Sequence, residues 1–105
     1  MARPTRQLRV PVITLVTSSG CHLCEMAKDV IASVAVETPL RLETVELASP
    51  DGAEIAKLHR MAFPPLILIN GQPHAHGRIS EKKFRHALDL LAADSVNGPI
   101  SGRSS

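Results

Sequence analysis

Two cysteines set three positions apart are the residues of this 105-residue chain best suited to chemistry. Cys21 and Cys24 are its only cysteines, and they enclose His22 and Leu23. This spacing closes too small a ring to staple a fold, but it suits reversible thiol–disulfide exchange or metal binding. We therefore predict that the pair is functional.

The residues around the pair predict a strand that leads into a helix. Residues 12–17 are rich in β-branched side chains and apolar on both faces, which is typical of a strand buried in the middle of a sheet. Ser18-Ser19-Gly20 then breaks this pattern, and a helix is expected to begin near Cys21. Its apolar stripe consists of Met26, Ala27, Val30, Ile31 and Val34.

A helix start at this point assigns different roles to the two thiols. Unpaired N–H groups and the helix dipole favour a thiolate at Cys21, which makes it the predicted nucleophile. Cys24 lies nearly one turn further on the same side, so it can resolve a mixed disulfide formed by Cys21. A protonated His22 would stabilise the thiolate and raise the reduction potential, and the alternative is an exposed loop histidine.

Three further strands are expected. Residues 40–47 predict the second strand, with a possible bulge near Thr44 where the alternation slips. Residues 66–69 are aliphatic and lead into Asn70-Gly71, a dipeptide that favours a tight hairpin turn. The third and fourth strands should therefore be antiparallel neighbours.

Two more helices are predicted from their caps. Ser49, Pro50 and Asp51 suit the start of a short helix, whose apolar residues are Ile55, Leu58 and Met61. Ser80 can cap a last helix, whose apolar stripe is Phe84, Ala87, Leu88 and Leu91. The element order β-α-β-α-β-β-α predicts an α/β fold with a four-stranded mixed sheet and helices on both faces.

Length and composition predict one domain. We expect residues 1–9 to be a flexible basic arm, residues 10–93 the domain and residues 94–105 a flexible tail. The net charge of +2, with two Phe and no Tyr or Trp, argues against nucleic acid as a partner. No apolar run reaches the roughly 20 residues of a membrane helix, so a cytoplasmic protein is expected, with secretion as the rival interpretation. We also expect the protein to be a monomer.

The sequence resembles the thioredoxin superfamily, and within it the glutaredoxin-like branch. The resemblance spans residues 10–91 and rests on the Cys21–Cys24 motif after the first strand, on Phe63-Pro64-Pro65 before the third, and on Asn70-Gly71. It implies the thioredoxin-like fold, with a cis-proline that faces the thiols.

The resemblance also implies where substrate binds. The spacing to Asn70-Gly71 places the cis-proline at Pro65, with Pro64 as the alternative. The backbone of the residue before it pairs with substrate in this family, and Pro64 has no N–H to donate. Phe63 is part of that segment. Gly77 and Ser80 match the family's anion site, where free N–H groups could hold a carboxylate, and Arg78 could assist them or be a solvated surface residue.

The function implied is that of a thiol–disulfide oxidoreductase that contributes to electron transport and cell redox homeostasis. The substrate would be a protein disulfide or a small thiol, and the electrons would come from glutathione or a flavoprotein reductase. No prosthetic group or metal is expected, although glutathione could serve as a co-substrate.

Two alternatives stay open. The cysteines could be half of a zinc site completed by His74 and His76, or the fold could bind a protein partner with its cysteines idle. His59 and His86 are interpreted as surface residues.

Overall fold

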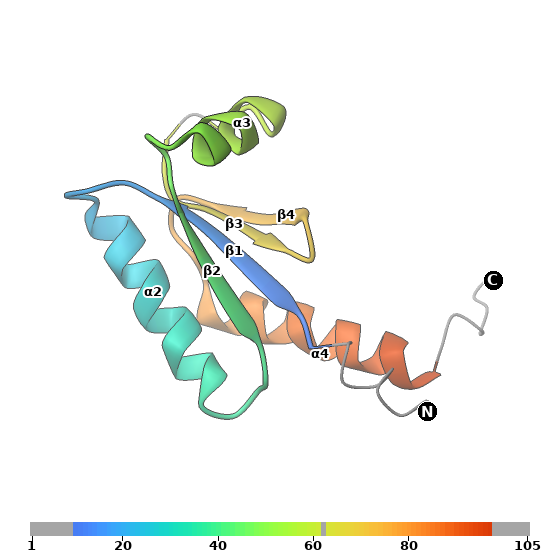
Figure 1. Cartoon of the computed structure of the whole chain (residues 1–105). Coiled ribbons are helices and arrows are strands. Elements are labelled where there is room, and N and C mark those ends of the chain that lie inside the picture. Colours follow the sequence, from blue (N-terminus) through green and yellow to red (C-terminus); the bar gives the residue numbers. More distant parts are fainter. Residues whose placement is uncertain (1–9, 62, 98–105) are drawn as a thin grey trace.

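Four strands form one mixed sheet of order β2-β1-β3-β4 in the computed structural model, which describes residues 10–61 and 63–97 (Figure 1). The bounds are β1 Val12–Thr17, β2 Arg41–Glu46, β3 Leu66–Ile69 and β4 Gln72–His76. β1 pairs with β2 in parallel and with β3 antiparallel, and β3 and β4 are antiparallel. The prediction of a central, buried first strand is confirmed, since Ile13, Leu15 and Val16 are fully buried.

Three helices cover the sheet. They are α2, His22–Ala35, α3, Pro50–Leu58, and α4, Glu81–Asn97. Figure 1 shows α2 and α4 on one side of the sheet and α3 on the other. The α/β thioredoxin-like architecture, with helices on both faces, is therefore confirmed. The α2 crossover allows β1 and β2 to run parallel, because such strands need a long connection.

The larger core lies between the sheet and the pair α2 and α4. Alternate sheet residues meet aliphatic side chains of α2 and one face of α4 there, and the main members are Ile13, Leu15, Ile67, Ile69, Ala27, Ile31, Val34, Phe84 and Leu88. A smaller core of Val16, Leu66 and Leu68 lies on the opposite face, packed by Leu47, Ile55 and Met61. The predicted apolar stripe of α4 is confirmed, whereas Met26 of the α2 stripe is 37% exposed.

The second strand differs from its prediction. β2 pairs with β1 residue by residue from Arg41 to Glu46, so no bulge occurs at Thr44. The irregularity lies instead in the hairpin, between Ile67 and Leu68 of β3. β2 is an edge strand whose residues are mostly exposed, and its alternation is therefore not enforced by burial on two faces.

The helix α3 begins as predicted and ends earlier. The Ser49 hydroxyl accepts the N–H of Gly52 at 3.0 Å, and Pro50 is the first helical residue. Leu58 was expected in the core but is 75% exposed. The helix stops there because Arg60 adopts a φ of 53°, and the N–H of Met61 returns to the carbonyl of Ala56 at 2.9 Å.

The hairpin and the last helix also follow local chemistry. Asn70 and Gly71 have φ values of 50° and 82°, as the predicted tight turn requires. Ser80 caps α4 by accepting the N–H of Lys83 at 3.2 Å.

The ends of the chain were predicted to be an arm and a tail. α4 includes residues 94–97, the first four residues of the expected tail. Residues 1–9 and 98–105 lie outside the described part of the chain. No helix within the described residues is long and apolar enough to cross a membrane.

A Cβ at Gly52 would collide with the backbone carbonyl of Glu46, which closes the turn between β2 and α3. We expect Gly52→Ala to lower the free energy of unfolding by about 1–3 kcal/mol, because backbone must move to admit the methyl group. Urea denaturation followed by circular dichroism measures the loss. The exposed neighbour Ala53, changed to Ser, is the matched control, and equal stability of both variants would contradict this account of the turn.

Candidate active site

The two cysteines form a disulfide at the start of α2. Cys21 is the N-cap residue of this helix, and its Sγ accepts the backbone N–H of Cys24 at 3.1 Å. The cap is therefore a sulfur atom where Ser or Asp is usual, so the helix start and the redox pair share one atom. When the disulfide is reduced, the same N–H points at the Cys21 thiolate and stabilises its charge.

The two sulfur atoms differ in access. Cys24 is fully buried among the core residues, whereas Cys21 is only partly buried. An external thiol or disulfide can therefore reach Cys21 first. The roles of Cys21 as nucleophile and Cys24 as resolving thiol stay predictions.

A proline loop faces the disulfide. The cis peptide bond joins Pro64 to Pro65, as the spacing to Asn70-Gly71 predicted. The Pro64 carbonyl oxygen lies 4.0 Å from the Cys21 Sγ. In the disulfide this sulfur carries no hydrogen, so the approach is a contact; a reduced Cys21 thiol could donate to the same oxygen.

Phe63, the residue before Pro64, is held by β4. Its ring is 53% exposed and lies against the His76 ring, with the two centroids 4.8 Å apart. The His76 Nε2 lies 2.8 Å from the Phe63 carbonyl oxygen. His76 was considered as a metal ligand from sequence alone, and its contact with Phe63 was missed because the two residues are 13 positions apart.

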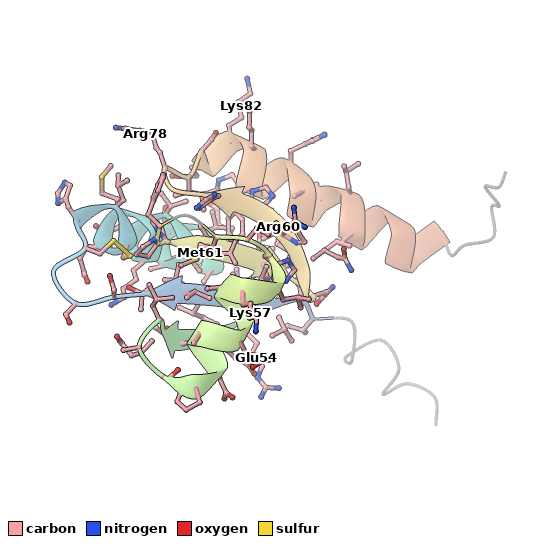
Figure 2. All side chains as sticks on the ribbon, turned by 90° about the horizontal axis from the view of Figure 1, so that it is seen from above. Glu54, Lys57, Arg60, Met61, Arg78 and Lys82 are labelled. Carbon is pink, nitrogen blue, oxygen red and sulfur yellow. A yellow bond between two sulfur atoms is a disulfide. The ribbon has the colours of Figure 1, made fainter. Side chains whose placement is uncertain are left out.

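Two of the residues expected to bind an anion, Gly77 and Ser80, make hydrogen bonds within the protein. The N–H of Gly77 was predicted to be free for a carboxylate, but it donates to the Pro65 carbonyl at 2.8 Å. The Ser80 hydroxyl accepts from Lys83, as the helix cap requires. Arg78 is exposed, and Figure 2 shows its side chain extending outward from the molecule. Arg78 therefore presents exposed side-chain donors, and the Ser80 hydroxyl keeps its own hydrogen to donate.

A hollow of about 210 Å³ lies beside the motif. Its lining residues come from α2 and from the segment before α4, and they are Leu23, Met26, Asp29, Val30, Arg78 and Ile79. Pockets for drug-sized ligands measure roughly 300–1,000 Å³, so this hollow suits one side chain of a bound segment. Leu23 and Met26 were not predicted as site residues, although their places beside the cysteines were the available signal.

Two further residues lie close to the motif along the chain, His22 and Thr17. His22 is exposed at the first position of α2, and its tuning role stays a prediction. Thr17, at the end of β1, is 2% exposed, and its hydroxyl has no hydrogen-bond partner among the described residues. A threonine at the end of the strand that leads to the cysteines was the signal for this position, which sequence reasoning did not use.

His74 and His76 do not converge on one site. The irregular pairing of β3 with β4 sets Ala75 opposite Ile67 and Pro73 opposite Leu68, so His74 occupies the bulge. Its ring meets Phe84 of α4, with centroids 5.6 Å apart, whereas His76 meets the proline loop. Within the described residues no three His, Cys, Asp or Glu side chains form a metal-binding group.

Fold and site together define a thioredoxin-like protein with a Cys-x-x-Cys pair, and comparisons with solved structures agree. A thioredoxin-like protein from Clostridium perfringens matches with a TM-score of 0.63 at 13% identity, over 78% of this chain and 71% of that one. A thioredoxin mutant from Halobacterium salinarum matches with a TM-score of 0.62 at 14% identity, over 77% of this chain and 74% of that one. Chloroplastic thioredoxin z matches with a TM-score of 0.64 at 12% identity, over 86% of this chain and 85% of that one.

A family model sharpens this class. The model described as Glutaredoxin-like domain (DUF836) matches residues 12–89, and the chain belongs to that family. No curated protein matches the sequence. The fold and the cysteine pair support a redox role.

Partial burial lowers the pKa of His74 below its ordinary value of 6.5, so folding disfavours its protonated form. The unfolded chain then binds more protons, and stability is lost as the pH falls below about 6.5. We expect the unfolding free energy to drop between pH 7 and pH 5, and His74→Gln to reduce that drop. Urea titrations at both pH values measure it, with the exposed His86→Gln as control; an unchanged drop in His74→Gln would assign it to other groups.

Proposed function

We propose that the protein is a thiol–disulfide oxidoreductase that cycles between a Cys21/Cys24 dithiol and the disulfide. The observation that carries the proposal is the place of Cys21: its sulfur caps α2, is partly exposed and is bonded to a buried Cys24. A purely structural disulfide would gain nothing from an exposed sulfur at a helix N-terminus.

The proposed reaction transfers two electrons in two exchanges. The Cys21 thiolate attacks one sulfur of a substrate disulfide, forming a mixed disulfide and releasing the first substrate thiolate, which takes a proton from water. The Cys24 thiolate then attacks the Cys21 sulfur, closing the Cys21–Cys24 disulfide and releasing the second thiolate. The reverse sequence oxidises a substrate dithiol by the same steps.

The residues around Cys21 are proposed to orient the substrate. The Pro64 carbonyl, 4.0 Å from the Cys21 sulfur, can accept a backbone N–H of an extended segment. Pro64 has no N–H and the N–H of Gly77 is engaged, so a bound backbone would receive few donors from this loop. Arg78 remains the group proposed to meet a carboxylate.

The physiological setting follows from this chemistry as part of the proposal. The substrate would be a protein disulfide or a small thiol, in a reducing compartment such as the cytoplasm. Glutathione or a flavoprotein reductase would restore the dithiol, and the protein would act as a monomer without a prosthetic group. With few free backbone donors near the loop, glutathione would be held mainly through its carboxylates.

A reversible dithiol–disulfide transition is the first expected outcome. The protein is equilibrated in buffers spanning roughly −300 to −150 mV, a range that brackets thiol oxidoreductases, and is then alkylated and weighed intact. We expect one two-electron transition, reported by the masses of the alkylated and disulfide forms. If the thiols persist across the range, or the native mass includes zinc, the proposal is wrong. The same titration of His22→Ala reports the tuning role, which an unchanged midpoint would dismiss.

The Cys24→Ser variant is expected to trap the reaction halfway, because the chain has no other thiol to resolve a mixed disulfide on Cys21. Mixing the reduced variant with a peptide disulfide should give a stable adduct of protein plus one peptide by mass spectrometry. Cys21→Ser is the matched control and should form little adduct, since Cys24 is buried. Full dithiol turnover by Cys24→Ser, or equal adducts from both variants, would contradict the assigned roles.

A further inference from the structure

Resting on the proposed function, we propose that His76 is a positioning residue. It fixes Phe63, the residue before the one whose carbonyl faces Cys21, and the fixed ring selects disulfide substrates that carry an apolar side chain next to the reacting cysteine. The geometry is a clamp: one histidine of β4 holds both the backbone and the ring of Phe63.

The backbone part of the clamp is a hydrogen bond. The His76 Nε2 lies 2.8 Å from the Phe63 carbonyl oxygen and 3.3 Å from the Phe63 backbone nitrogen. One ring nitrogen cannot donate to the first and accept from the second at the same time. A hydrogen on Nε2 donates to the Phe63 carbonyl, and an Nε2 without a hydrogen accepts the Phe63 N–H. In either tautomer the ring is bonded to the Phe63 backbone.

The side-chain part of the clamp is ring packing. The Phe63 and His76 rings are tilted by 32°, with their centroids 4.8 Å apart, within the range of favourable aromatic pairs. Gly77 completes the seat, because a Cβ there would stand 3.2 Å from the Phe63 Cε1 atom. The ring therefore rests on the His76 ring and on a position without a side chain.

The clamp holds the residue next to the one whose carbonyl faces Cys21. His76 holds Phe63, and the N–H of the next residue, Gly77, holds the Pro65 carbonyl at 2.8 Å. Pro64 lies between these two anchored residues, and its carbonyl oxygen is the one 4.0 Å from the Cys21 Sγ. Loss of the His76 contact would free one of the two anchors of this segment.

Phe63 is 53% exposed although it is aromatic and packed on one side. A large apolar ring held in one orientation, one residue before the carbonyl that faces Cys21, gives a substrate side chain a surface to cover. Because the ring is already ordered, that contact costs little further conformational entropy. Covering part of it should strengthen binding by roughly tenfold, the order that one modest apolar contact supplies.

Two peptide disulfides test the proposal. One is the disulfide-linked dimer of acetyl-Gly-Leu-Cys-Gly-amide, and the other has serine in place of leucine. Reduced protein is mixed with an excess of each, and the oxidation rate is followed against peptide concentration. For the natural chain we expect a half-saturating concentration about tenfold lower for the leucine peptide than for the serine peptide.

The variants separate positioning from folding. His76→Ala should raise the half-saturating concentration for the leucine peptide about tenfold, with a less than threefold change in limiting rate and an unchanged midpoint potential. His76→Gln, whose amide N–H can reach the Phe63 carbonyl, should restore part of the preference. Phe63→Ala should raise the half-saturating concentration for the leucine peptide by the same factor. Adding His76→Ala to Phe63→Ala should raise it no further, because the two residues act as one unit. His86→Ala, exposed on α4, is the matched control.

Each outcome bears on a different claim. A natural chain that reacts with both peptides without preference, or a His76→Ala variant that keeps the preference, overturns the positioning role. A His76→Ala variant with a shifted midpoint potential or a collapsed limiting rate also overturns it, because the residue would then act on the thiols or on the whole fold. A natural chain that reacts with neither peptide and has no dithiol–disulfide transition overturns the proposed function itself.

Discussion

The sulfur of Cys21 caps α2 and accepts the N–H of Cys24 at 3.1 Å, and the site depends on this one contact. The N–H of Cys24 can stabilise a thiolate at Cys21 only while the first turn of α2 is held firmly at the end of β1. The core provides that hold, because Ala27, Ile31 and Val34 anchor the helix against the sheet. Packing well away from the disulfide therefore maintains the electrostatics of the Cys21 sulfur.

The second half of the site comes from a later part of the chain, at the same end of the sheet. The β3–β4 hairpin places the proline loop before β3 beside the two residues that end β4 and follow it, His76 and Gly77. Antiparallel pairing of β1 with β3 then sets this loop against the start of α2, where the Pro64 carbonyl faces Cys21. The two halves meet through strand order, since about forty residues separate them along the chain.

Local signals were sufficient for most elements and for the cysteine pair. The Asn70-Gly71 turn and the Ser49 cap of α3 depend on neighbours within a few positions, and both occur as predicted. The prediction for Leu58 was wrong: its spacing fits a helical stripe, but it is the last residue of α3 and its side chain is exposed. The prediction of a free N–H at Gly77 was wrong for a different reason. Its hydrogen-bond partner, the Pro65 carbonyl, belongs to another segment of the chain.

The sequence by itself determined that Cys21 and Cys24 would lie at a strand-to-helix junction, because spacing, turn residues and apolar periodicity are short-range properties. It also determined which residue before β3 lacks a backbone donor, since a proline at position 64 removes it covalently. Tertiary structure alone decided what faces the sulfur and what holds the loop. His74 and His76 are two positions apart, yet a bulge sends one to Phe84 and the other to Phe63. Such contacts follow from strand register and packing, which no local pattern encodes.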